Sequence, residues 1–148
     1  MTTTFAELRQ DFSARIVLIG GGWNASPVPF ALHGPDNVPD AVPASKAHLS
    51  FAVGLDSAAD VEQRQRLNVG ARTTTAATVR FFSRYTPHDG ITSEDAALDH
   101  EHDLIKQVVA TATDFSVTWT SSDRELVPSG EWFVHEVEFA AYHLLPLT

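Results

Sequence analysis

The last third of the chain constrains the fold most, because it has the pattern of one amphipathic helix followed by two strands. Residues 94–110 place apolar side chains three or four positions apart, the spacing of a helix that buries one face. Phe115–Thr120 and Glu131–Tyr142 alternate apolar and polar residues, as half-buried strands do, and 121–130 is predicted to be a loop. We expect this unit to be scaffold and surface without assembled chemistry.

The N-terminal residues predict a second helix. Thr4 and Glu7 have the spacing of a capping box, and apolar residues then recur every three or four positions through residues 5–19. Three glycines at 20–22 are expected to end this helix. A short buried strand over Ile16–Ile19 is the alternative, because short apolar runs fit both periods.

Residues 23–46 form a proline-rich segment without periodicity. Proline lacks the amide that helices and sheet ladders require, so we expect an irregular loop or arm, with a short strand around residues 28–32. Long loops inside compact domains are uncommon and often functional. This segment is therefore our first candidate for a partner contact.

The middle of the chain favours strands. Leu49–Leu55 alternates strictly, 56–63 is polar and turn-like, and 73–85 is rich in β-branched and aromatic residues. The alternation resumes at Leu67, Val69 and Ala71, and together with 73–85 this part fits one long strand with a bulge near Gly70 or two shorter strands. The order of elements predicts a single α+β domain over residues 1–148, with a mainly antiparallel sheet of four or five strands and two helices on one face.

Composition excludes several classes of function. The formal net charge is −9, which disfavours a basic groove for nucleic acid. The chain has no cysteine, which excludes disulfides and thiolate metal ligands. No apolar run approaches the roughly 18 residues needed to span a bilayer. The N-terminal residues lack a basic start, so they do not fit a signal peptide. We expect a soluble protein with no membrane partner.

A glycine motif at residues 20–25 resembles a dinucleotide fingerprint. Gly20, Gly22 and Ala25 follow an apolar run, but the fingerprint requires a helix directly after the glycines to bind the pyrophosphate. Ser26–Pro29 follows instead. The simpler interpretation is a helix stop.

Ligand-type side chains gather at residues 99–103. His100 and His102 would diverge by about 200° on a helix, whereas zinc-binding histidines usually stand four residues apart. A solvated acidic helix face, in which the histidines tune an interface with pH, is the better interpretation. Glu136 and Glu138 share a strand face, a common arrangement that does not by itself indicate catalysis. His135, His143 and the serines belong to no nucleophile motif, so we predict no catalytic residue, cofactor or metal.

Arginines concentrate between Gln63 and Tyr85 in a chain that is otherwise acidic. Such a dipolar charge distribution suits head-to-tail association of subunits, although scattered surface arginines are an equally good interpretation. The interface candidates are Arg64, Arg66, Arg72, Arg80, Arg84, Asp99, Glu101, Asp103, Glu136 and Glu138.

The order of these elements resembles the tail terminator (tail-completion, head–tail joining) proteins of long-tailed bacteriophages. The segments that carry the resemblance are Arg80–Tyr85, the helix Asp95–Val109 and Ser129–Phe139. The resemblance implies a homo-oligomer, a hexameric ring that caps the tail tube protein and meets the head–tail connector. It implies no cofactor and no enzymatic activity, with genome DNA passing through the lumen without specific binding.

The resemblance also implies a location in the tail or neck of the virion, and in the host cytoplasm during assembly. Two alternatives stay open. One is a head–tail adaptor or stopper, which the sequence does not distinguish from a terminator. The other is a small ligand- or metal-binding α+β enzyme that uses the Gly20–Ala25 turn or the His100/His102 cluster.

Overall fold

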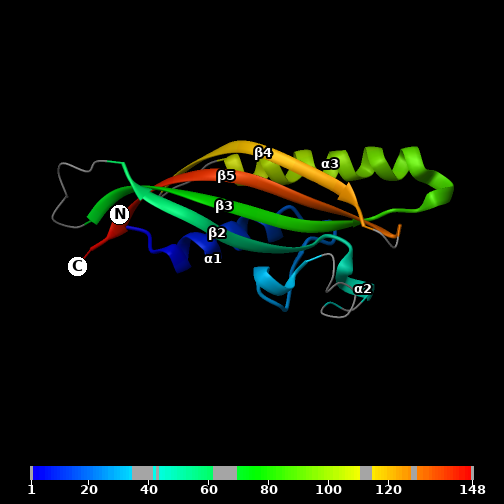
Figure 1. Cartoon of the computed structure of the whole chain (residues 1–148), viewed down its shortest axis with the longest axis horizontal. Helices are drawn as coiled ribbons and strands as arrows, with labels where there is room; N and C mark the ends of the chain where they lie inside the picture. Colours follow the sequence, from blue (N-terminus) through cyan, green and yellow to red (C-terminus); the bar gives the residue numbers. More distant parts are fainter. Residues whose placement is uncertain are drawn as a thin grey trace.

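The computed structural model describes residues 2–34, 42, 44–61, 70–110, 115–127 and 130–147. They form an α+β fold in which helices cover a five-stranded sheet (Figure 1). In chain order the elements are α1 (Phe5–Val17), β1 (Asn24–Ala25), the 3₁₀ helix η1 (Phe30–Leu32), α2 (Ala44–Ala47), β2 (Ser50–Asp60), β3 (Gly70–Arg84), the 3₁₀ helix η2 (Pro87–Asp89), α3 (Gly90–Val109), β4 (Ser116–Leu126) and β5 (Trp132–Pro146).

The sheet has the order β1-β2-β3-β5-β4. β1 pairs with β2 in parallel, and every other neighbouring pair is antiparallel, so the predicted mainly antiparallel sheet is confirmed. β3 and β5 are the central strands and pair along their whole lengths. The ladder is irregular at two places, between Leu55 and Ser57 in β2 and between Trp119 and Ser121 in β4, instead of near Gly70 as predicted.

The helix α1 confirms the N-terminal prediction. The Thr4 hydroxyl accepts a hydrogen bond from the Glu7 amide, and the Glu7 carboxylate accepts one from the Thr4 amide, which completes the capping box. The helix ends at Val17, and Gly20, Gly21 and Gly22 all have positive φ, which favours glycine. Ile16–Ile19 is therefore not a strand.

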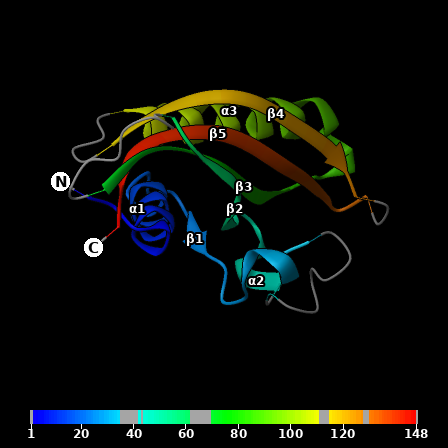
Figure 2. The ribbon, with the colours of Figure 1, turned by 60° about the vertical axis from the view of Figure 1, so that its left-hand side comes forward.

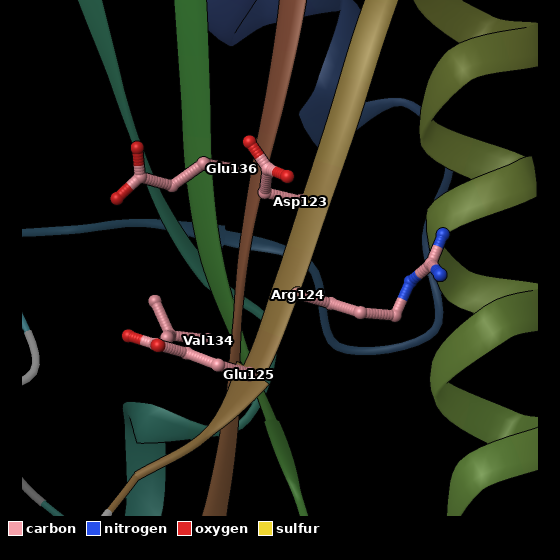
Figure 3. Close-up of a pocket in the computed structure, with 5 residues that line it drawn as sticks. All are labelled: Asp123, Arg124, Glu125, Val134 and Glu136. Carbon is pink, nitrogen blue, oxygen red and sulfur yellow. The ribbon is translucent and has the colours of Figure 1, made fainter.

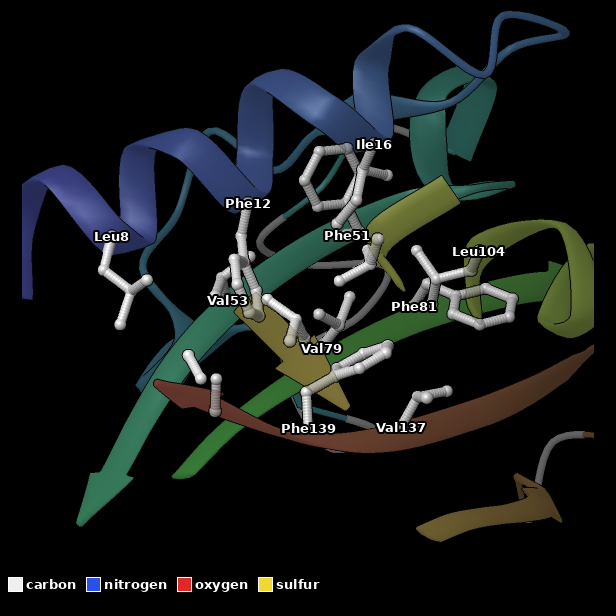
Figure 4. Close-up of a cluster of buried hydrophobic side chains, with 14 of the residues drawn as sticks. Leu8, Phe12, Ile16, Phe51, Val53, Val79, Phe81, Leu104, Val137 and Phe139 are labelled. Atoms are coloured by element: carbon white, nitrogen blue, oxygen red, sulfur yellow. The ribbon is translucent and has the colours of Figure 1, made fainter. Parts of the chain in front are cut away.

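The sheet has two differently covered faces. On one face, called here the helix face, Leu8, Phe12 and Ile16 of α1 and Leu104 and Val108 of α3 join one buried cluster with the apolar residues of the strands (Figure 4). α1 lies toward β2 and α3 toward β4 in both views (Figures 1 and 2). The two helices share one core, as the sequence pattern predicted.

The opposite face, called here the arm face, is partly covered by the arm, defined as the described residues between Ala25 and Ser50. The arm buries Val42 and Ala47 against Phe82, Trp132 and Val134. The predicted strand at 28–32 is wrong, because Phe30–Leu32 is a 3₁₀ helix. The described part of the arm therefore lies on the chain's own sheet, and its contact with a partner stays a prediction.

Two boundaries in the last third differ from the prediction. β4 continues to Leu126, because residues 121–126 pair with residues 133–138 of β5, and this long-range pairing overrides their polar composition. α3 begins at Gly90, four residues before the predicted start at residue 94. The Ser93 hydroxyl accepts a hydrogen bond from the Thr86 amide and fixes the preceding turn.

No helix in the described ranges is both long enough and apolar enough to cross a membrane.

Candidate functional site

A chain of four polar side chains crosses the helix face. The Ser83 hydroxyl lies 2.9 Å from His135 Nε2, and His135 Nδ1 lies 3.0 Å from Glu101 Oε1. Arg124 grips the same carboxylate with two nitrogens, Nε at 3.0 Å from Oε1 and Nη2 on Oε2. The four residues come from β3, β5, α3 and β4 respectively, so the network joins α3 to three strands of the sheet.

The partners fix the protonation of this network. Burial by itself raises the pKa of Glu101, but the hydrogen bonds from His135 and Arg124 and the positive charge of Arg124 outweigh it and lower the pKa to about 2. Glu101 is therefore a carboxylate that only accepts hydrogen bonds, so His135 Nδ1 carries a proton. When the ring carries only this proton, Nε2 is an acceptor and takes the hydrogen bond from the Ser83 hydroxyl.

The order hydroxyl, imidazole, carboxylate is the one that hydrolases use to activate a serine. Here both reactive groups are closed off, since Ser83 is 1% exposed and His135 is 0% exposed. The ring of Phe81 stacks on His135 with a centroid distance of 4.1 Å and an interplanar angle of 4°. A groove of about 360 Å³ between α3 and β4 is lined by Phe133 and Arg124, but neither Ser83 nor His135 is among its described lining residues. The network therefore holds α3 on the sheet, and Ser83 and His135 are closed off from a substrate in this conformation.

Sequence reasoning did not find this network. The residues stand far apart in the chain, and the sheet register brings them together by placing Phe81 opposite His135 and Ser83 opposite Phe133. Glu101 was predicted to lie on a solvated acidic helix face, which is wrong, because it is 5% exposed. The burial of Glu101 could have been predicted from its position three residues before Leu104, which places it on the buried stripe of α3.

Two further buried histidines pair with hydroxyl groups. His143 Nε2 lies 2.7 Å from Thr75 Oγ1, and its Nδ1 lies 3.0 Å from the Thr3 carbonyl oxygen. His33 Nε2 lies 3.1 Å from Ser50 Oγ. These pairs fasten the N-terminus and the arm to opposite faces of the sheet.

His100 and His102 do not form the ligand cluster that the sequence left open as an alternative. His102 is exposed, whereas His100 is half-buried, with its ring 5.5 Å from that of His48 and 6.2 Å from that of Trp23. Burial lowers the pKa of both His48 and His100. Within the described residues, no three histidine or carboxylate side chains are grouped so that they could hold a metal ion.

The predicted arginine interface is divided among different roles. Arg64 and Arg66 lie outside the described residues, and Arg72 is exposed at the start of β3. Arg84 is exposed and stands 4.9 Å above the Trp132 ring. Arg80 instead binds the arm internally: its Nη1 donates to the carbonyl oxygens of Phe30 at 2.9 Å and His33 at 3.0 Å.

The remaining carboxylate candidates are on the surface. Asp99 and Asp103 are exposed on α3, as predicted for the acidic helix face, and Glu138 is exposed on β5. Glu136 is half-exposed and accepts a hydrogen bond from Arg80 Nε at 3.2 Å.

An acidic depression of about 330 Å³ lies on the arm face between β4 and β5. Figure 3 shows Asp123, Glu125 and Glu136 around this depression, and Arg124 turned away from them toward α3. The arm face is consequently acidic at this position, because the one arginine of the group points to the other side of the sheet.

The glycine motif contains no phosphate site in its described surroundings. α1 precedes the glycines, and the two-residue strand β1 follows them where the dinucleotide fingerprint needs a helix. The expectation of a helix stop agrees with this geometry.

No protein-family model matches this chain, and no curated protein is similar enough in sequence to be identified as a relative.

Proposed function

We propose that this chain is a structural subunit that assembles into a ring, ends the tail tube of a long-tailed bacteriophage and joins it to the head connector. The observation that carries the proposal is the open edge of the sheet. β4 has eleven residues, nearly all of them on the surface, and among the described residues no strand pairs with its outer edge. Isolated edges of this length promote association with another chain.

The rigidity of the subunit supports an assembly role. β3 and β5 are fifteen-residue strands paired over their full length, and the polar network ties α3 to them through Glu101 and His135. A stiff sheet with a long exposed edge would hold the neighbouring subunit in one fixed orientation.

The acidic arm face supports the passage of DNA without binding. Asp123, Glu125, Glu136 and Glu138 all belong to this face in β4 and β5. Carboxylates repel the phosphate backbone, so a lumen lined by the β4–β5 part of this face favours release of the genome. The β3 part of the same face contains Arg72, Arg80 and Arg84, and Arg80 pairs with Glu136. The proposal therefore places the arm face toward the lumen and includes no cofactor, metal or catalytic step.

The test combines solution mass with electron microscopy. Light scattering on the purified chain, alone and mixed with phage tail tubes, is expected to show a closed oligomer and rings seated on tube ends. Rings that bind an isolated head connector but not tube ends identify an adaptor or stopper instead. A monomer at all concentrations that never caps a tube contradicts the proposal.

A further inference from the structure

The register of the sheet defines which residues of its two outermost long strands are level with each other. Ser57 of β2 is paired with Ala76, Ala76 with Ala140, and Ala140 with Thr118 of β4. By the same steps, Leu55 is level with Trp119. Level residues on β2 and β4 point to the same face of the sheet.

The part of β2 that β1 covers is level with the charged end of β4, and the uncovered part of β2 is level with the uncharged end. β1 covers β2 only at Ser50 and Phe51. Through β3 and β5, Phe51 is level with Arg124, in the charged end of β4. The uncharged part of β4, Ser116–Ser122, is level with the part of β2 that β1 leaves open, Val53–Ala59.

The directions of the strands also match. β2 is antiparallel to β3, β3 to β5, and β5 to β4, so β2 and β4 run in opposite directions. A rotation about an axis along the strands therefore places β2 of a second copy antiparallel to β4 of the first. Each copy then contributes its β4 edge to one neighbour and its β2 edge to the other. This is the head-to-tail arrangement that closes a ring.

We propose that the subunit contact is a continuous sheet, in which β4 of one copy pairs antiparallel with the open part of β2 of the next copy. The inference rests on the proposed ring function and names its interface. It places Thr118 beside Ser57 of the next copy on the arm face, and half-exposed Trp119 beside Leu55 of the next copy on the helix face.

Charge disfavours one displaced register of this contact. In the level arrangement Asp123 stands beside Ala52 of the next copy, at a distance from the Asp56 bulge. A slide along the strands that brings Asp123 to Asp56 places like charges across the junction, which is unfavourable. The acidic end of β4 thus opposes this displaced pairing while the uncharged end forms the intended one.

A double cysteine variant tests the contact. The natural chain has no cysteine, so any disulfide must join the introduced residues. Ser57→Cys combined with Thr118→Cys is expected to form disulfides between copies under mild oxidation, giving a ladder that ends at the closed ring. Within one chain β3 and β5 separate these positions by about 14 Å, since strands are about 4.8 Å apart, whereas a disulfide needs Cα atoms within about 7 Å. Both positions are exposed, so folding is checked simply by an unchanged circular dichroism melt.

The matched control is Ser57→Cys with Asp123→Cys. Its second cysteine is on the same strand and the same face as residue 118, but it is not level with Ser57. It is expected to stay uncross-linked. Efficient dimers from Thr118→Cys alone overturn the inference in favour of β4 pairing with β4 of a second copy. Rings that form normally but do not cross-link in the double variant overturn the inference and leave the ring function standing; absence of any oligomer of the natural chain rejects the ring function itself.

Tryptophan emission gives a second readout of the same contact. Trp119 is 50% exposed, whereas Trp23 and Trp132 are 6% and 5% exposed. Assembly is expected to shift the emission to shorter wavelength in the natural chain and not in a Trp119→Phe variant. The same shift in that variant contradicts the proposed contact.

Discussion

Glu101 and His135 are hydrogen-bonded 34 residues apart in sequence, with Glu101 Oε1 3.0 Å from His135 Nδ1. Glu101 is on α3, and His135 is on the central strand β5. Both side chains are buried, and Arg124 of the edge strand completes the group. This contact makes the fit of α3 on the sheet depend on charge as well as on apolar packing.

Replacing Glu101 by glutamine is expected to destabilise the protein by about 1–3 kcal/mol, because it removes the buried carboxylate that accepts hydrogen bonds from His135 and from the half-exposed Arg124. Glutamine keeps the shape but leaves Arg124 without a counter-charge. Urea unfolding followed by circular dichroism measures the effect. Asp103→Asn, on the exposed face of the same helix, is the control and should stay within about 0.5 kcal/mol of the natural chain. Equal effects of the two substitutions refute the role of the network.

Ser83→Ala is expected to cost about 1–3 kcal/mol, since it leaves His135 Nε2 buried without a partner. The measurement is the shift in urea midpoint at constant slope. Ser116→Ala at the exposed start of β4 serves as the matched control. A neutral Ser83→Ala would mean that the hydroxyl makes no net contribution to holding the imidazole.

Acid is expected to loosen the arm through His33. The Ser50 hydroxyl donates to the Ala47 carbonyl oxygen, so His33 Nε2 must be the donor to Ser50, and His33 Nδ1 is a buried atom without a described partner. Burial and the nearby Arg80 charge lower the pKa of His33 to about 4 from the ordinary 6.5. The unfolded chain therefore binds this proton first.

Because the folded pKa of His33 is the lower one, the protein should lose stability as the pH falls from 6.5 to about 4. At 1.36 kcal/mol per pH unit the loss is at most about 3 kcal/mol. His33→Gln, which retains a donor toward Ser50, should flatten the unfolding free energy over this range. His102→Gln, at an exposed imidazole, controls for the loss of a histidine. Identical pH profiles for natural chain and His33→Gln would exclude the mechanism.

Gly54→Ala is expected to displace the arm. A methyl group at residue 54 would stand 2.6 Å from the Phe30 ring, and the Arg80 guanidinium lies 4.1 Å from the centroid of that ring. Overpacking of this kind costs about 1–3 kcal/mol. Limited proteolysis of the arm and thermal melts measure the effect. Gly34→Ala, with nothing within 4 Å of the added methyl, is the control and should be nearly neutral.

The sequence determined the local structure wherever periodicity and capping agree. The Thr4–Glu7 capping box, the apolar stripe of α1 and the alternation around Phe51 each depend on residues within a few positions of one another. These signals were sufficient for the α+β class, the two packed helices and the mainly antiparallel sheet. Chain-local rules failed at residues 121–126, whose polar composition indicates a loop, because pairing with β5 is a long-range effect.

The tertiary structure alone decided the chemistry of the interior and the faces of the sheet. Periodicity gave no indication that Glu101 meets Ser83, His135 and Arg124, because that meeting depends on the strand order and register. The same register brought Arg80 to the arm, where its Nη1 donates to two carbonyl oxygens. Charge counts predicted an asymmetric surface, but only the packing of α3 and the arm determined which charges are buried in internal pairs and which stay on the surface.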